Sequence, residues 1–493
     1  MKRHARAGAA RRLLAGLAAV FADPSPWPKV GVIFCLAMPQ LYLLPEGTID
    51  IAFSTAFVAA LVPVVLLSVK PGPGRELFST GLVRVLVALL AVRLLALVWS
   101  PDPRAGLPPI VLLGQFMIIL MLMVAALRQD ADALWRLLRF YWPWVLLEVF
   151  LVILFRLQPA MEDAFLRSIG KFFAGQNTIA GLFGEHRNNV LDPLKSGGVF
   201  INANLAAMFL GVNGLAALAV SSITKSRLVR SVGIVALVAV PFTSSKLATI
   251  LAFALPALAV ALFYLKRSVT TKVRFYLLGG SGLLGMAGIF VLAGLGLLDG
   301  LQKAFGSRTI IWNFGLESFQ ENVFLGLGYG GWAMGFPSYA AEQGFYGVNF
   351  PPHNLLLAAW SATGLLGLAL TVAFIALVLR LIVSRLSDPA RYDTGFVAFG
   401  GAAIAWVFIQ GMGENTDIFG EIHIMPVFAL LIGYLARHVG KEKNHDVAAF
   451  DGRNCATSAI PAVGDVHLQP GPGHAQLSSA VRRQGCNPDH LGC

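Results

Sequence analysis

Charged residues and metal-binding motifs are scarce in this sequence. Only 13% of its 493 residues are charged and 56% are hydrophobic, whereas a soluble domain has about 25% charged residues. The four cysteines form no CxxC pair, which argues against a zinc ribbon or a disulfide scaffold. HExxH, DxD and Walker A sequences are also missing. We therefore expect no metal and no cofactor, and the composition excludes a disordered protein, a coiled coil and a nucleic-acid-binding domain.

Long apolar runs are abundant instead. A hydrocarbon core needs about 20 apolar residues per helix, and about twelve stretches approach that length. They lie near residues 30–44, 49–69, 83–99, 109–127, 140–155, 199–221, 229–242, 247–265, 275–298, 354–382, 394–412 and 418–436. The sequence therefore predicts an all-α, polytopic integral membrane protein with about 12 transmembrane helices.

The basic residues orient these spans. Lys and Arg concentrate in alternate connections, near residues 70–75, 128–139, 225–230, 266–274 and 380–391, and in the N-terminal segment 2–12. Such residues favour the cytoplasmic side, so both termini are predicted to be cytoplasmic. The net charge of +12 then reports topology rather than a surface that binds polyanions. A cleaved signal peptide at residues 2–22 is the alternative, and it would invert this orientation.

The predicted organisation has seven parts. Residues 1–28 form a basic cytoplasmic segment and residues 437–493 a disordered cytoplasmic tail. Transmembrane helices occupy residues 29–155, 199–298 and 354–436. Two long connections, residues 156–198 and 299–353, both face the non-cytoplasmic side. Because long loops are usually functional or linkers, the chemistry is expected there.

The second long connection carries the sharpest candidates. Arg308 opens a helix-like segment, and Gly326 and Gly328 allow close approach of the backbone to a ligand. His353 and Asn354 follow two prolines and precede an apolar helix. An imidazole at a helix N-terminus can accept a proton or, when protonated, bind phosphate. The alternatives are an ordinary glycine-rich surface loop and a polar helix cap at the level of the lipid headgroups.

Further cations and amides lie on the same predicted side. Lys195 precedes the helix that contains Asn202 and Asn204, and Lys246 stands in a short outer turn; Arg187 is a weaker candidate. Basic residues held at membrane level usually have a partner or a function, although a lysine can also snorkel to the interface.

Acidic residues near or within the spans offer partners for these cations. Arg93 and Glu148 can form an ion pair across the bundle. Glu414 and Asp417 make the last outer turn acidic, where they can orient a cation or a sugar hydroxyl. A reaction on this face without nucleotide or metal needs a substrate that is already activated, such as a lipid diphosphate, whose charge Arg and Lys can bind.

Four ordered stretches carry a resemblance to a known family. They are Lys195-Ser-Gly-Gly-Val-Phe-Ile-Asn-Ala-Asn204, Thr243-Ser-Ser-Lys246, Ser307-Arg-Thr-Ile-Ile-Trp312 with Leu325-Gly-Leu-Gly328, and His353-Asn-Leu-Leu-Leu357 with Gly364-Leu-Leu-Gly367. The chain resembles the O-antigen ligase and O-antigen polymerase superfamily of bacterial envelope proteins over roughly residues 195–370. The Arg-Thr-Ile-Ile-Trp form looks most like the exopolysaccharide-polymerase branch.

The resemblance implies a multi-pass protein of the bacterial inner membrane that joins glycans on the periplasmic side. Its donor would be an undecaprenyl-diphosphate-linked glycan, and its acceptor a glycan or lipid A–core. A chain-length regulator or export machinery would be a further partner. His353 and Arg308 match the family's essential loop residues. Lys195 and Lys246 stand where arginine is common and lose its bidentate fork, and Ala362 stands where a glutamate is frequent.

Two alternatives remain open. An O-antigen ligase differs from a polymerase only in capping lipid A–core, and the sequence holds no signature of the acceptor. A secondary transporter of an envelope precursor would have internal repeats and broken helices near the midplane, and neither is evident in the sequence.

Overall fold

The computed structural model describes residues 58–60, 81–174, 194–200, 202–264, 308–347 and 349–437. The chain divides into two compact units, Met1–Val439 and Gly440–Cys493, and every described residue belongs to the first. The predicted spans near residues 30–44 and 275–298, the N-terminal segment, Arg187 and the C-terminal tail lie outside the described residues, as does most of the predicted span 49–69.

The described residues form helices without strands, as predicted. The longer helices are α5 (Gly81–Ala96), α6 (Leu107–Leu137), α7 (Trp142–Leu157), α11 (Ala203–Thr224), α12 (Arg227–Ala239), α13 (Lys246–Tyr264), α18 (Leu355–Leu386), α19 (Thr394–Gly411) and α20 (Met425–Ala436). Six helices in the described part are long and apolar enough to cross a membrane. The predicted total of twelve is not confirmed by this number.

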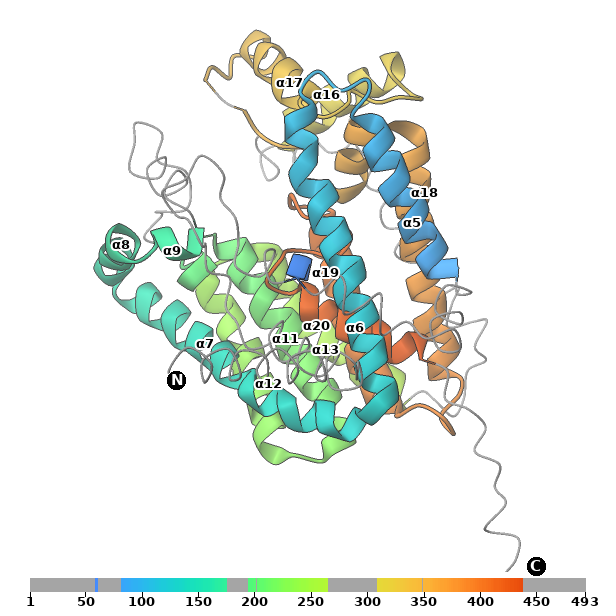
Figure 1. Cartoon of the computed structure of the whole chain (residues 1–493). Helices are drawn as coiled ribbons and strands as arrows, with labels where there is room; N and C mark the ends of the chain where they lie inside the picture. The colour runs from blue at the N-terminus through green and yellow to red at the C-terminus, as the bar shows by residue number, and fades with distance from the viewer. Residues whose placement is uncertain are drawn as a thin grey trace, which may run out of the picture. The chain divides into compact units, whose positions relative to one another are not determined.

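The two long connections contain short helices of their own. Residues after α7 form α8 (Pro159–Ser168) and α9 (Lys171–Ala174). Between residues 308 and 353 lie α16 (Arg308–Glu321) and α17 (Gly331–Glu342). Both lie together beyond the ends of α5 and α6, near the start of α18 (Figure 1).

Side-chain caps explain where several helices begin. Asn202 caps α11, Ser226 caps α12 and Asp393 caps α19, each by accepting a hydrogen bond from a backbone N–H in the first turn. These residue types satisfy the free N–H groups of a helix start. The last span begins later than predicted, at Met425 instead of residue 418, because Asp417 and Gly420 pair their backbones in a tight turn.

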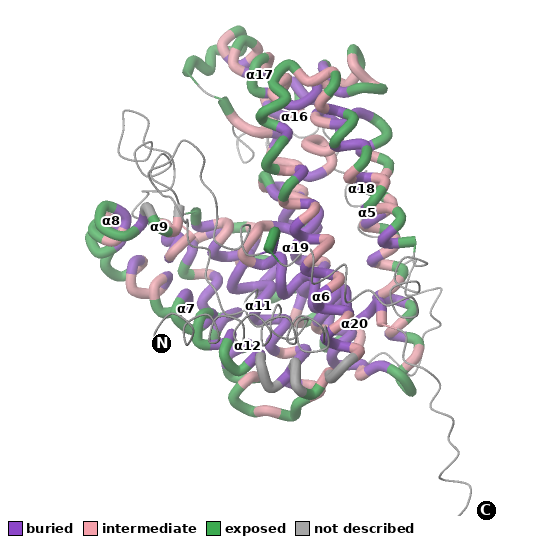
Figure 2. The backbone as a smooth tube through the Cα atoms, viewed as in Figure 1, coloured by how far each residue is buried: buried purple, intermediate pink, exposed green. Residues whose placement is uncertain are grey.

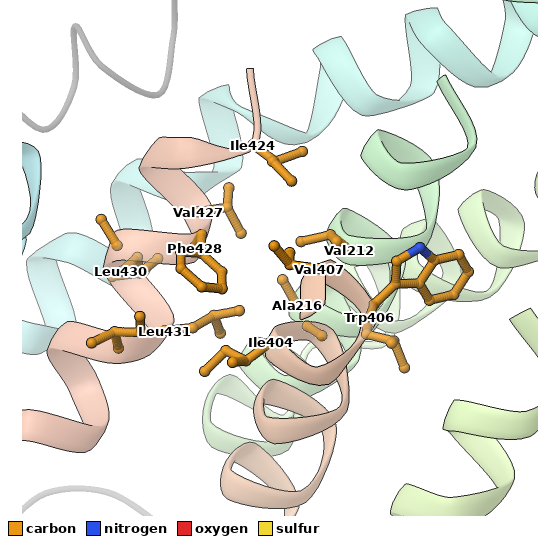
Figure 3. Close-up of a cluster of buried hydrophobic side chains, with 14 of the residues drawn as sticks. Val212, Ala216, Ile404, Trp406, Val407, Ile424, Val427, Phe428, Leu430 and Leu431 are labelled. Carbon is orange, nitrogen blue, oxygen red and sulfur yellow. The ribbon is translucent and has the colours of Figure 1, made fainter. Parts of the chain in front are cut away.

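The buried core runs through the middle of the bundle. α11 packs against α19, and 83% of the residues in the most apolar 18-residue stretch of each of these two spans are buried, compared with 28% in the corresponding stretches of α13 and α18. Figure 2 shows the buried residues concentrated in α11, α19 and α20. In Figure 3, Phe428 and Leu431 of α20 face Ile404 and Val407 of α19. Central helices that are apolar all round are expected in a membrane bundle, and the outer helices leave faces for lipid.

Helix α18 is broken at Gly364, where a continuous span was predicted. Gly364 has φ 69° and ψ −165°, a region open almost only to glycine. The break is filled by the loop before α17: Leu327 N–H donates to Ser361 O (2.8 Å), and Leu365 N–H donates to Phe324 O (3.1 Å). A Cβ on Gly364 would lie 2.0 Å from Phe324 O. The break therefore anchors the glycine-rich loop to α18.

Candidate functional site

His353 is held at the start of α18 in an unusual conformation. Its φ is +46°, a left-handed value uncommon for a non-glycine residue. The next residue, Asn354, caps α18 by accepting hydrogen bonds from Leu356 N (2.9 Å) and Leu357 N (3.0 Å). Its amide also donates to Met412 O (3.1 Å), just beyond α19. Such conformations persist where neighbouring structure imposes them, often at active sites.

Glu414 is the residue on which the candidate side chains converge. Arg308, the first residue of α16, donates from Nη2 to Glu414 Oε1 (3.0 Å). Asn204, in the first turn of α11, donates from Nδ2 to the same oxygen (2.9 Å). His353 Nδ1 lies 3.9 Å from the other oxygen, Oε2. Segments around residues 204, 308, 353 and 414 thus meet at one carboxylate.

A chain of hydrogen bonds ties this carboxylate to the core. Trp406 Nε1 donates to Gln410 Oε1 (2.6 Å), and Gln410 Nε2 donates to Asn204 O (2.8 Å). Trp406 and Gln410 are both 1% exposed or less. Because fully satisfied buried networks are rigid, Asn204 and Glu414 are fixed relative to α11 and α19.

Electrostatics at the cluster favour a neutral histidine. Burial, and secondly the positive charge of Arg308, lower the pKa of His353 below its usual value. Burial raises the pKa of Glu414, while Arg308, the hydrogen bond from Asn204 and the charge of Lys195 oppose that rise. His353 Nδ1 is buried and has no hydrogen-bond partner among the described residues. A neutral imidazole of this kind can accept a proton.

Lys195 stands in a loop whose backbone is tightly held. Ser196 N–H donates to Thr243 O (3.4 Å), so the loop lies beside the turn that contains Lys246. Gly197 N–H donates to Glu162 (3.2 Å) and Val199 N–H donates to Glu148 (3.1 Å). The positive charge of Lys195 also helps to lower the pKa of Glu414.

The residue after Lys246, Leu247, lies close to the cluster. Lys246 itself is exposed and begins α13. A Cβ on Gly413 would lie 3.4 Å from Leu247 Cδ2 and 3.6 Å from Arg308 Nη1. The start of α13 and the Arg308 guanidinium therefore flank the same glycine.

Three other predicted site residues have structural surroundings. Asn202 caps α11 by accepting a hydrogen bond from Asn204 N (2.8 Å). Gly326 has φ +67°, and a Cβ there would lie 2.2 Å from Trp360 O at the break in α18. Gly328 packs against Ser100 instead of the Glu414 cluster. A ligand role for these three stays a prediction.

The expected pairing of Arg93 with Glu148 is wrong. Arg93 donates from Nη1 and Nη2 to the two oxygens of Asp417, both at 2.7 Å, and from Nη1 to Pro109 O (2.9 Å). Glu148 accepts from the Val199 backbone instead. Glu414 thus pairs with Arg308 at the start of α16, and Asp417 pairs with Arg93 of α5.

The sequence reading did not single out His423 and Glu421. The His423 ring nitrogen Nδ1 bonds to the Glu421 carboxylate, and its ring packs edge-on against Phe200, with centroids 4.4 Å apart. Phe200 belongs to the motif between Lys195 and Asn204, which is the only sequence signal that could have drawn attention to this pair. Within the described ranges, no group of three or more His, Cys, Asp or Glu side chains is arranged to hold a metal ion.

Comparisons with known proteins bear on the region that holds the cluster. No curated protein matches the chain. The family model described as O-antigen ligase matches residues 231–372, from α12 to the first half of α18. Lys246, Arg308 and His353 lie inside the match, whereas Asn204 and Glu414 lie outside it. The resemblance to the O-antigen ligase and O-antigen polymerase superfamily is therefore confirmed over residues 231–372.

Proposed function

We propose that this protein is a membrane glycosyltransferase that polymerises a glycan carried on undecaprenyl diphosphate at the periplasmic face. One observation carries the proposal. Arg308 and His353, the two residues implied by the family resemblance to be essential, meet at a single carboxylate, Glu414, 3.0 and 3.9 Å from its oxygens. The alternation of basic connections supports the periplasmic location of this cluster.

The donor diphosphate would bind to the cations at the cluster. Arg308 bonds to Glu414 through one nitrogen, and the Arg308 side chain remains 34% exposed. A guanidinium has five N–H donors in a rigid fork that fits phosphate oxygens. Lys195 and Lys246 add positive charge from the loop before α11 and from the start of α13. Together these groups can stabilise the charge that develops on the leaving diphosphate.

In the proposed reaction, a hydroxyl oxygen of the acceptor sugar attacks the anomeric carbon of the donor glycan. The new bond is the glycosidic C–O bond, and the bond between the anomeric carbon and the phosphate oxygen breaks. Undecaprenyl diphosphate leaves with that electron pair. His353, kept neutral by burial and by Arg308, takes the hydroxyl proton.

Glu414 would act through its neighbours. When His353 Nδ1 carries its proton toward Oε2 of Glu414, the free lone pair is on Nε2. Hydrogen bonds of catalytic residues are often long before substrate binds, and the 3.9 Å separation is of that kind. Glu414 is therefore a positioning residue that sets the tautomer of His353 and the direction of Arg308.

The ligase is a second candidate, because the matching family model is described as O-antigen ligase. It would use the same donor and the same cluster and would transfer the glycan to lipid A–core. A transporter is less well supported. Its broken helices expose backbone groups that coordinate the cargo, but Ser361 O and Leu365 N at the break of α18 bond to the neighbouring loop.

The proposal can be tested with His353→Ala and Arg308→Ala in a deletion strain. Both are expected to abolish polymer, scored as glycan chain length on gels. Arg167→Ala is the matched control, because Arg167 is exposed and pairs with Asp163 of the same helix, α8. Purified protein with labelled lipid-linked glycan then separates the acceptors: longer lipid-linked chains identify a polymerase, and glycan on added lipid A–core identifies a ligase. Wild-type product from both alanine variants would refute the proposal.

A further inference from the structure

A cleft of about 580 Å³ is lined in part by the chain neighbours of the Glu414 cluster residues. It is bordered by α5, by the start of α18 and by the loops at residues 328–333, 349–352 and 415–418. Pro352 and Asn415 line it, and they are the chain neighbours of His353 and Glu414. Sites for small ligands have volumes of roughly 300–1,000 Å³. The cleft is therefore large enough for a ligand whose end reaches the cluster.

Three residues that line this cleft carry a buried hydroxyl group without a hydrogen-bond partner in the described part of the chain. The hydroxyl oxygens are Tyr329 Oη, Thr371 Oγ1 and Thr416 Oγ1, on residues that are 6%, 0% and 9% exposed. Buried polar groups in folded proteins almost always have partners. Three of them in one cleft indicate a ligand that supplies the partners.

The charges of the cleft indicate that this ligand is neutral. Among the described residues that line it, Arg93 and Asp417 are the only charged ones, and they neutralise each other in a bidentate pair. Arg308, Lys195 and Lys246 are not part of the lining. A diphosphate would find no unpaired cation here, so the cleft is distinct from the proposed diphosphate site.

The remaining surfaces suit a sugar ring. Leu355 and Ala358 provide apolar wall, and the aromatic residues Tyr329 and Trp332 add more. Burial is the main cause that raises the pKa of Tyr329 to about 12, so its hydroxyl stays protonated and can both donate and accept. A pyranose has an apolar C–H face and hydroxyls at its rim, which is the complement of this lining.

We propose that this cleft binds a neutral sugar residue of the acceptor glycan, whose hydroxyls bond to Tyr329, Thr371 and Thr416. The inference rests on the proposed function, because only a glycosyltransferase needs an acceptor sugar beside His353. The diphosphate of the donor would lie with Arg308, so the acceptor hydroxyl would reach His353 from the side of Pro352.

A binding experiment tests the cleft separately from catalysis. The probe is the oligosaccharide released by mild acid from the lipid-linked glycan of the source strain, titrated into full-length protein in nanodiscs by calorimetry. Tyr329→Phe, Thr371→Val and Thr416→Val each remove one hydroxyl with little change of shape. Each is expected to weaken oligosaccharide binding about two- to tenfold, and the triple variant at least about tenfold. A spin-labelled fatty acid serves as the lipid probe.

Two matched variants control for general effects. Tyr339→Phe removes a hydroxyl that bonds to Glu317 outside the cleft, and Thr224→Val removes one that bonds to Val220 O. Both are expected to bind like wild type. Unchanged oligosaccharide binding by the triple variant, or binding of the fatty acid alone, would overturn the inference. His353→Ala should lose glycan transfer and keep oligosaccharide binding. Wild-type protein that binds the oligosaccharide without transferring glycan would refute the proposed function and leave the inference about the cleft intact.

Discussion

Substituting Glu414 by glutamine tests the proposed role of this carboxylate most directly. Glutamine keeps an oxygen at the position of Oε1, where Asn204 and Arg308 donate at 2.9 and 3.0 Å. It replaces Oε2, 3.9 Å from His353 Nδ1, by an NH₂ group. Two N–H groups cannot bond to each other, so His353 would accept at Nδ1 and carry its proton on Nε2. The imidazole would then present no lone pair to the acceptor hydroxyl.

The expected loss follows from the step that is removed. General base catalysis contributes about 10²- to 10⁴-fold to a rate, which corresponds to roughly 2.7–5.5 kcal/mol of the barrier. We expect kcat of Glu414→Gln to fall within that range, with KM for the donor within a few-fold of wild type. The effect on folding should be small, about 1 kcal/mol, because the Arg308 side chain is 34% exposed and solvent screens the pair.

The assay is turnover of labelled lipid-linked glycan by purified protein, together with the thermal midpoint of each variant. Glu317→Gln is the matched control, because Glu317 accepts a hydrogen bond from Tyr339 on the exposed face of α17 and α16. Glu414→Asp keeps the charge and should retain more activity than Glu414→Gln. If Glu414→Gln folds normally and keeps wild-type kcat, the carboxylate does not set the tautomer of His353, and the reasoning is wrong.

Three further predictions follow from the same structure. Because burial and Arg308 lower the pKa of His353, the neutral form persists at neutral pH, and kcat of the wild type should fall on acidification with a midpoint below the ordinary value near 6.5. Arg308→Gln should raise the pKa of His353, which is followed by NMR titration of the imidazole because this variant is expected to be inactive. Gly364→Ala should lower the unfolding free energy by at least about 2 kcal/mol, because the φ of Gly364 is 69° and a Cβ would meet Phe324 O. The effect is measured as a lower thermal midpoint. Gly344→Ala, at an exposed turn with open space, controls for the added methyl and the positive φ. Arg93→Ala should destabilise by about 3 kcal/mol, because it removes the charge partner of the Asp417 carboxylate, which is only 17% exposed. Arg93→Lys should be intermediate, and both are measured by thermal unfolding in detergent.

The sequence was most informative where function depends on local pattern. Apolar runs predict helices wherever the structure describes them, and the motif order pointed to Arg308, His353 and Asn204, which the structure brings together. Glu414 and Asp417 were recognised only as an acidic turn. Nothing local assigns one to Arg308 and the other to Arg93, because those partners are 106 and 324 residues away along the chain.

The break in α18 could not be predicted for a related reason. A single glycine in an apolar run is compatible with a continuous helix. What makes Gly364 a break is the Phe324–Leu327 loop, which supplies partners to Ser361 O and Leu365 N. Gly326 of that loop was predicted to bind a ligand, because close approach to a ligand and close approach to another backbone require the same residue.

The two arginines that pair with the turn after α19 show how geometry separates a structural cation from a functional one. Arg93 is 8% exposed, and both of its terminal nitrogens donate hydrogen bonds, to the Asp417 carboxylate and to Pro109 O. Arg93 therefore has few N–H donors free for a substrate, which agrees with the proposal that the cleft binds a neutral ligand. Arg308 makes one charged hydrogen bond at 3.0 Å and remains a third exposed. Since a diphosphate needs unused N–H donors more than it needs charge alone, Arg308 is the one of these two arginines that we propose binds it.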